Sequence, residues 1–240
     1  MSPHIHVDHL IVVAGPSFSG KSTFIRWLQR GRMPDVQKAL GIARAENWVM
    51  ESATTVGDLG EKRIDRMILH YDITRMLGKA PEPWRRAEPI AVMKDADVLT
   101  VVNIWTAQDV LLRRLHGLMR LVQMAEAVRA RRPLRMLRIA VEDARASTLP
   151  AHARYALASL FTRRIRSRLE RVDETRSICG WKETLYRDAR ALRELYTDWI
   201  SFCDGLEPAA QYAWRGDGPV QHLTEVSAIM SERLDAAHSH

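Results

Sequence analysis

The chain has 240 residues, a formal net charge of +7 at pH 7 and 46% hydrophobic residues. A chain of this length and composition is most simply one α/β domain that can bury a full core. Its two cysteines, Cys179 and Cys203, are too few for a disulfide framework or a cysteine metal cluster. Since no segment is apolar enough for a membrane span or a signal-peptide core, we expect a cytoplasmic protein without a membrane partner.

The apolar run at 9–14 predicts a first strand, and a helical pattern at 21–30 follows it. Between them, Gly15 to Ser22 match G-x-x-x-x-G-K-[ST], the pattern of a phosphate-binding loop. A plain Gly-Ser turn is the alternative, but the strand before and the helix after favour a nucleotide site. The residues expected to bind nucleotide are Gly15, Pro16, Ser17, Phe18, Ser19, Gly20, Lys21, Ser22 and Thr23.

Each part of such a loop has a physical role. Glycines let successive backbone N–H groups turn toward an anion, and the helix that follows adds the positive end of its dipole. Lys21, expected at the surface, would reach the β- and γ-phosphates, and the Ser22 hydroxyl would ligate Mg²⁺. The expected cofactors are therefore ATP and Mg²⁺.

Four further runs predict strands at 47–51, 67–71, 98–104 and 211–214, with helical patterns between them. This alternation predicts an α/β fold, a doubly wound, mainly parallel five-stranded sheet of the P-loop NTPase type. The phosphate-binding loop would then lie at the carboxyl edge of the sheet, where open α/β folds bind ligands.

Asp72 ends the third predicted strand, in the Walker-B position. There it would hold Mg²⁺ through water or accept a proton from an attacking hydroxyl. The alternative role is an N-cap for the helix that "DITRML" could begin. We favour the metal role because the phosphate-binding loop and this carboxylate would then belong to one site. His70 should share a strand face with Asp72, as a packed residue or as a second candidate for catalysis.

Acidic and histidine residues also occur away from this edge. Asp95 and Asp97 precede the fourth strand at its amino end and are interpreted as turn residues. His4 and His6 alternate in "HIHVDH", and "HSH" ends the sequence. No carboxylate or cysteine spacing completes a metal site at either place, so none is expected there.

Arginines are crowded between residues 113 and 171, in a section that predicts one helix from 107 to about 129, before Pro133, and another at roughly 151–171. Much of this charge fits a solvated helix face. A basic surface also fits nucleic acid or a phosphorylated small molecule, and we favour the latter because a lid over a triphosphate needs guanidinium groups. Residues 107–175 would form a helical Arg-rich lid and acceptor region within a single domain, 1–223.

Two segments complete the chain. Residues 181–203 place Trp181, Leu185, Leu192, Leu195, Trp199 and Phe202 near one helical stripe, which predicts core packing rather than a ligand platform. Residues 224–240 have little apolar periodicity and are expected to form a frayed helix or a disordered tail.

"GPSFSGKST" resembles the loop of guanylate kinases and related small P-loop kinases, which commonly read G-P-S-x-x-G-K-S-T. Residues 97–120 also resemble the stretch where a strand of that superfamily leads into a helix with lid arginines, which implies Arg114 and Arg120 as lid residues acting in catalysis. The acceptor segment differs: residues 52–62 keep Thr54-Thr55 and Gly60-Glu61 but lack the arginines between them. We therefore do not expect a nucleoside-monophosphate acceptor.

The sequence predicts an ATP-dependent kinase acting on an unidentified small molecule. A first alternative is an NTPase that couples hydrolysis to a protein or nucleic-acid partner. The sequence contains neither a guanine-reading N-K-x-D segment after the fourth strand nor an L-S-G-G-Q transporter signature. A second alternative is a sulfotransferase, whose loop usually lacks the pair seen here as Gly20-Lys21.

Overall fold

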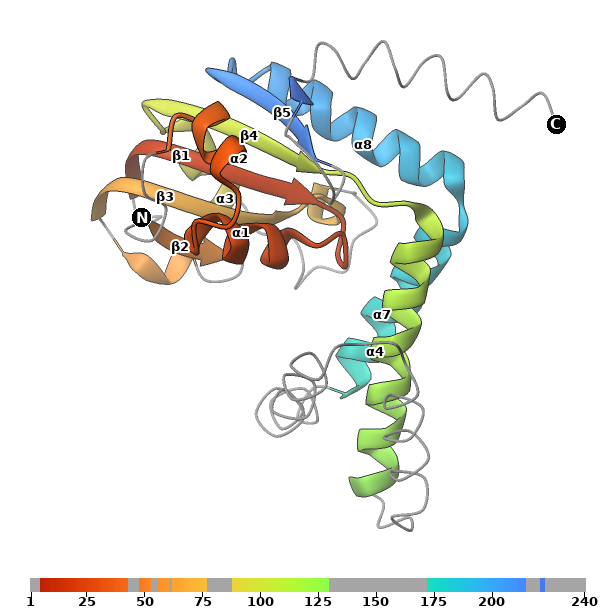
Figure 1. Cartoon of the computed structure of the whole chain (residues 1–240). Helices are drawn as coiled ribbons and strands as arrows, with labels where there is room; N and C mark the ends of the chain where they lie inside the picture. Colours follow the sequence, from red (N-terminus) through yellow and green to blue (C-terminus); the bar gives the residue numbers. More distant parts are fainter. Residues whose placement is uncertain are drawn as a thin grey trace, which may run out of the picture. The chain divides into compact units, whose positions relative to one another are not determined.

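The computed structural model describes residues 5–42, 48–52, 56–60, 62–76, 88–129, 172–214 and 221–222. The chain divides into two compact units, Met1–Ala107 with Arg190–His240 and, separately, Gln108–Ala189. The first unit contains the sheet and the second contains a helical pair (Figure 1). Among the described helices, none combines the length and the apolarity that crossing a membrane requires.

The described part of the first unit contains one sheet with the strand order β2-β3-β1-β4-β5-β6. The first five strands are parallel to their neighbours, and β6 is antiparallel to β5. The strands are β1 (Ile5–Gly15), β2 (Val49–Ser52), β3 (Lys62–Asp72), β4 (Val98–Ile104), β5 (Ala210–Trp214) and β6 (Gln221–His222). The five predicted parallel strands are confirmed, and the two-residue β6 adds an edge too short for a sequence pattern.

Strands β1 and β3 extend beyond their apolar runs toward their amino ends. Ile5 pairs with Lys62 and His6 with Arg63, so the strands continue where buried apolar residues alternate with polar ones. The hydrophobic pattern indicates only the part of a strand that is buried on both faces, which is why the predicted bounds are too short.

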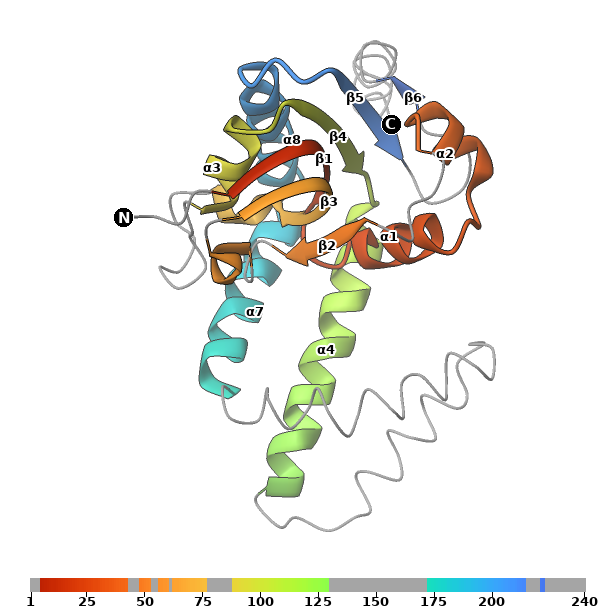
Figure 2. The same ribbon diagram turned by 90° about the vertical axis from the view of Figure 1, so that its left-hand side faces the viewer.

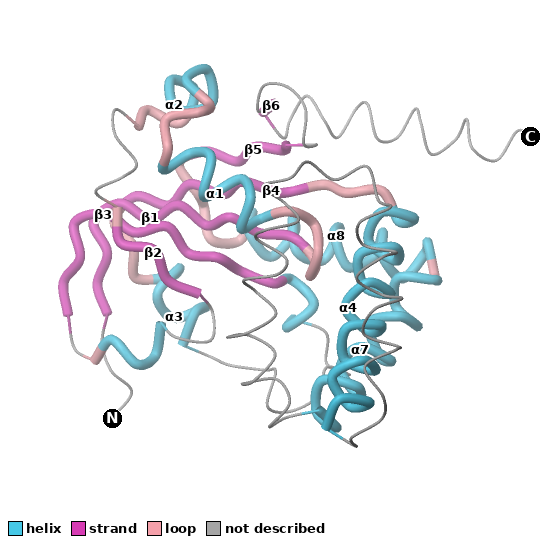
Figure 3. Tube along the Cα trace, turned by 60° about the horizontal axis from the view of Figure 1, so that its bottom comes forward, coloured by secondary structure: helices cyan, strands magenta, loops and turns pink. Residues whose placement is uncertain are grey.

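Helices cover both faces of the sheet (Figures 2 and 3). Helices α1 (Lys21–Gln29) and α2 (Pro34–Ala39) lie on one face, and α3 (Glu88–Lys94) and α8 (Ala189–Asp204) lie on the other. Phe24 and Leu28 of α1 and Val36 of α2 pack into a core with strand residues Ile11, Val13, Ile68, Val102, Ile104 and Trp214. This is the doubly wound α/β arrangement that the alternation of elements predicts.

The other face is joined to α8 by a buried polar contact. The indole Nε1 of Trp199 donates to Asn103 Oδ1 at 2.7 Å, and Asn103 Nδ2 donates to the carbonyl of Tyr212 at 3.1 Å. Trp199 is fully buried and stacks on Tyr71 of β3 with ring centroids 5.0 Å apart. One α8 side chain therefore contacts β3 by stacking and β4 by a hydrogen bond.

The second unit contains α4 (Gln108–Arg129) and α7 (Val172–Arg187). Gln108 Nε2 donates to the carbonyl of Tyr186 at 2.8 Å, and His116 lies 3.0 Å from Glu183, so the two helices are antiparallel. The helix predicted from 107 to 129 is confirmed. The predictions for 151–171, most of the lid region and the tail at 224–240 lie outside the described residues.

The single stripe predicted over 181–203 is wrong, because Asp188 separates α7 from α8. Trp181 and Leu185 belong to α7, whereas Leu192, Leu195 and Trp199 are buried on α8. A break of one residue, without proline or glycine, leaves the 3.6-residue periodicity almost undisturbed, and the sequence therefore shows no boundary. Core packing is confirmed for Leu192, Leu195 and Trp199, whereas Phe202 of α8 is only partly buried.

We predict that Trp199→Phe lowers the free energy of unfolding by about 1–3 kcal/mol, because the buried Oδ1 of Asn103 loses its indole donor. Urea unfolding followed by far-UV circular dichroism measures this loss. Trp27→Phe is the control, since Trp27 is 36% exposed, and it should cost less than about 1 kcal/mol. Equal losses in the two variants would contradict the role given to the Asn103 contact.

Candidate functional site

Residues 15–23, the predicted phosphate-binding segment, are called the 15–23 loop here, although the last three form the first turn of α1. The loop leaves the carboxyl end of β1, which is paired with β3 on one side and β4 on the other. Gly15 ends β1 with φ +154°, and a Cβ placed there would lie 2.8 Å from both Ile104 O and Ser19 Oγ. Any side chain at this position would therefore meet the backbone of β4. The first glycine of the motif is required by this close approach of the loop to the sheet.

The loop ends at Gly20, which has φ +104° and is the N-cap of α1. No side chain caps the helix at this residue, so the positive end of the α1 dipole is not neutralised by a capping carboxylate or hydroxyl. Phe18 has φ +71°, a conformation that costs a residue with a side chain about 1–3 kcal/mol. A strained backbone next to an uncapped helix end is typical of a binding loop.

Lys21 is the first residue of α1, and its side chain turns back into the loop. Its side chain is 3% exposed, and its ammonium group donates to the carbonyls of Gly15 at 2.8 Å and Pro16 at 2.7 Å. The expectation that Lys21 lies at the surface is therefore wrong: the loop curls around its own lysine. The two carbonyl acceptors offset the cost of burying the charge, and they hold the ammonium group at the first turn of α1.

Asp72 ends β3 and is paired with Gly15 in the parallel register, so the carboxylate lies beside the beginning of the loop. Its side chain is 6% exposed. Oδ2 accepts a hydrogen bond from the Ser17 hydroxyl, and Oδ1 accepts from the Thr74 amide at 3.2 Å and the Thr74 hydroxyl at 2.8 Å. Asp72 thus caps the 3₁₀ turn η2 (Ile73–Met76), as its alternative role required, and also tethers the 15–23 loop to β3.

Ser22, the predicted metal ligand, is exposed at the start of α1, and its Oγ lies 3.3 Å from His70 Nε2. His70 pairs with Val13, two residues before the Gly15–Asp72 pair, so it shares a strand face with Asp72 as predicted. Burial and the nearby Lys21 ammonium lower the pKa of His70 to about 4. The imidazole is therefore neutral at pH 7 and adds no charge beside Ser22.

Thr106, just after β4, is a site residue that sequence reasoning missed. Its hydroxyl donates to the carbonyl of Ser19 at 2.7 Å, and the Ser19 amide donates to the carbonyl of Pro16 at 3.2 Å. The buried Ser19 hydroxyl has no hydrogen-bond partner within the described part of the chain. The loop is thus held from β3 through Ser17 and from β4 through Thr106, and no motif spacing indicates the second tether.

The two predicted lid arginines belong to the second unit. Arg114 and Arg120 are exposed on α4, whereas the loop and strand residues described above belong to the first unit. Most of the arginine-rich sequence between 129 and 171 lies outside the described residues. The site consists of one loop and the carboxyl ends of β1, β3 and β4.

The chain was also compared with known proteins. No protein-family model, curated protein or solved structure matches it.

Proposed function

We propose that the chain is an ATP-dependent phosphotransferase that acts on a small-molecule acceptor. The observation that carries the proposal is the buried Lys21 ammonium, held by the carbonyls of Gly15 and Pro16 at an uncapped helix end. A buried cation and a positive helix terminus on one loop suit a polyanionic ligand such as a triphosphate. A plain turn between a strand and a helix would not require a buried charge.

The neighbouring carboxylate supports a magnesium nucleotide rather than a bare anion. Asp72 would hold the ion together with Ser22, since a carboxylate and a hydroxyl are hard oxygen ligands of the kind that Mg²⁺ takes. Both Asp72 oxygens are already hydrogen-bonded by Ser17 and Thr74, so an ordered water would mediate its contact to the ion. Bound Mg²⁺ would supply positive charge against the β- and γ-phosphates.

In the proposed reaction an acceptor oxygen forms a bond to the γ-phosphorus while the bond from that phosphorus to the β–γ bridging oxygen breaks. Lys21 would neutralise charge that develops on the phosphoryl oxygens, and Asp72 would either hold Mg²⁺ through water or receive the acceptor proton. Ser17 and Thr106 tether the loop and would keep it in position through the transfer. Arg114 and Arg120 remain the proposed lid residues.

A kinase must keep water from the γ-phosphate until its acceptor is bound. The arginine-rich section after β4, part of a compact unit of its own, has the size and charge that such a lid requires. The alternative, an NTPase driven by a protein or nucleic-acid partner, uses the same loop and differs in what receives the phosphoryl group. The label-transfer experiment below distinguishes the two.

We predict that Lys21→Ala removes stabilisation by ATP and Mg²⁺. At a ligand concentration of 100 times Kd, binding should stabilise the wild-type protein by about 2.7 kcal/mol, and the variant should gain less than about 1 kcal/mol. Because Lys21 is buried, each variant is compared with its own ligand-free melting temperature. Lys38→Ala, at an exposed position of α2, is the matched control. A wild-type shift in Lys21→Ala would show that the loop does not bind the nucleotide.

For Asp72→Asn we expect turnover at least about 100-fold lower, with nucleotide affinity within about tenfold of the wild type. The amide keeps an acceptor for Thr74, so the cap on η2 is retained while the negative charge is lost. Steady-state turnover and isothermal titration calorimetry measure the two quantities. Asp35→Asn, exposed on α2, provides the charge-matched control. Unchanged turnover in Asp72→Asn would leave this carboxylate with the capping role alone.

The nature of the phosphoryl acceptor is tested with ATP labelled on its γ-phosphate and a metabolite extract. We expect slow release of inorganic phosphate with ATP alone and transfer of label to a small molecule once the extract is added. Asp72→Asn protein is the blank for contaminating kinases. Label found only as inorganic phosphate, at a rate raised by nucleic acid or by a protein, would instead favour the NTPase.

A further inference from the structure

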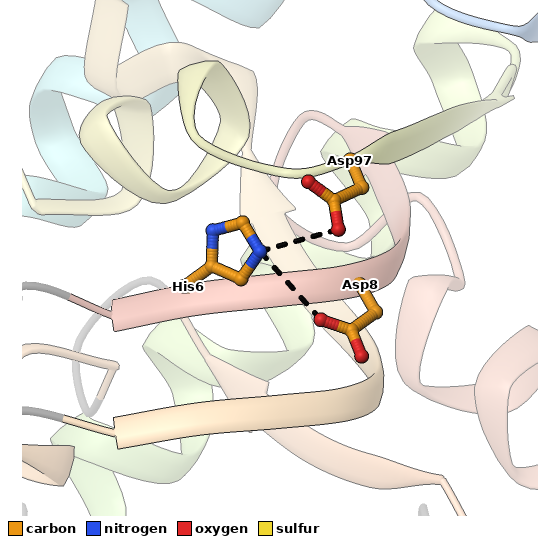
Figure 4. Close-up of side chains that lie close together, drawn as sticks. All are labelled: His6, Asp8 and Asp97. Carbon is orange, nitrogen blue, oxygen red and sulfur yellow. Dashed lines mark hydrogen bonds and ion pairs between the residues drawn. The ribbon is translucent and has the colours of Figure 1, made fainter.

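A second cluster of polar side chains lies at the amino edge of the sheet, formed by His6, Asp8 and Asp97 (Figure 4). His6 and Asp8 alternate on β1, and Asp97 directly precedes β4. His6 Nε2 lies 3.2 Å from Asp97 Oδ2 and 3.6 Å from Asp8 Oδ1, and the potential ligand atoms all lie within 4.8 Å of one another. We call this group the amino-edge cluster.

We propose that the amino-edge cluster binds one divalent transition-metal ion of the zinc class, through His6 Nε2 and one oxygen each from Asp8 and Asp97. In a tetrahedral zinc site with bonds of about 2.0–2.1 Å, two ligand atoms lie about 3.3–3.4 Å apart. The two distances from His6 Nε2 lie close to that value. One imidazole with two carboxylates is a donor set that such an ion accepts, and water would complete the coordination.

A carboxylate also lies near the other nitrogen of the same imidazole. His6 Nδ1 lies 3.5 Å from Asp95 Oδ2, which is on the side opposite the proposed ion. Histidines that bind metals almost always present their second nitrogen to a carboxylate, a carbonyl or water, which fixes the tautomer and the ring orientation. Asp95 would be that partner once the imidazole binds the ion.

The backbone holds the three ligands in place. His6 and Asp8 lie on a strand that is hydrogen-bonded to β3, where His6 is paired with Arg63. The Asp97 amide donates to the carbonyl of Val7 at 3.0 Å, so Asp97 is attached to β1 at the residue between the other two ligands. An ion at this position would link β1 directly to the turn between α3 and β4.

The charges around the cluster favour a divalent cation, and the Arg63 guanidinium would compete with it. Three carboxylates, from Asp8, Asp95 and Asp97, surround one imidazole. Arg63 Nε donates to Asp8 Oδ1 at 2.9 Å, and Arg63 Nη2 lies 3.9 Å from Asp97 Oδ2. Arg63 is 69% exposed, so it can leave the cluster at little cost because exposed ion pairs contribute little. The ion and the guanidinium would therefore compete for the same carboxylates.

Zinc binding to the full chain tests this proposal, in a background where His4, His238 and His240, the histidines nearest the two ends of the sequence, are each replaced by glutamine. Isothermal titration calorimetry with ZnCl₂ should show one equivalent bound. Titration with CoCl₂ should give the visible absorption of tetrahedral Co²⁺. Absence of both signals would overturn the proposal.

Four variants in that background test His6 as a ligand and the roles of its neighbours. His6→Ala should weaken zinc binding by at least about tenfold, and Asp95→Asn should weaken it by about tenfold. Arg63→Gln should tighten binding, because the competing guanidinium is gone. His9→Ala, at an exposed position of β1 outside the cluster, should leave the affinity unchanged. Circular dichroism checks that each variant folds.

Binding that survives in His6→Ala would show that the zinc lies elsewhere. Weaker binding in Arg63→Gln would show that the ion and the arginine do not share the carboxylates, which also contradicts the proposed site. The proposal does not rest on nucleotide binding: Lys21→Ala should bind zinc like the wild type, whatever the result with ATP.

Discussion

The pairing of β1 between β3 and β4 is the constraint on which the rest of the first unit depends. In this parallel arrangement Gly15 lies opposite Asp72, and Ala14 lies opposite Asn103. Three strands therefore end together, and the 15–23 loop receives a carboxylate tether from β3 and a hydroxyl tether from Thr106 after β4. The same pairing brings the amino ends together, so that Asp97 lies beside His6. One register thus creates both candidate sites.

Burial of charge distinguishes the carboxyl edge from an ordinary sheet edge. Lys21 and Asp72 are each less than 10% exposed there. Burying such groups is costly unless they are hydrogen-bonded, and the loop satisfies Lys21 with its own carbonyls while Ser17 and Thr74 satisfy Asp72. Well-packed apolar side chains at these positions would often give equal or greater stability. The proposed phosphoryl transfer provides a reason for keeping them charged.

The two edges differ in accessibility and in the kind of ligand that each suits. At the carboxyl edge a buried cation and an uncapped helix suit an anion. At the amino edge, partly exposed carboxylates around His6 suit a cation, and Arg63 already supplies one. The face between them is held by Trp199, which stacks on Tyr71 and bonds to Asn103, so α8 is attached to the strands that position both edges. A metal ion at the amino edge would stabilise the sheet without taking part in the chemistry proposed for the other end.

The sequence by itself determined the parallel α/β sheet, the position of the 15–23 loop, the helix after β4 and the shared face of His70 and Asp72. All of these follow from local periodicity and short motif spacing. Only the tertiary structure decided that Lys21 is buried, that Asp72 receives the Ser17 hydroxyl, that Thr106 holds Ser19, and that Asp188 divides two helices. It also placed Asp97 beside His6, 91 residues away in sequence. Contacts between strands distant in sequence depend on register and packing, and no local pattern contains that information.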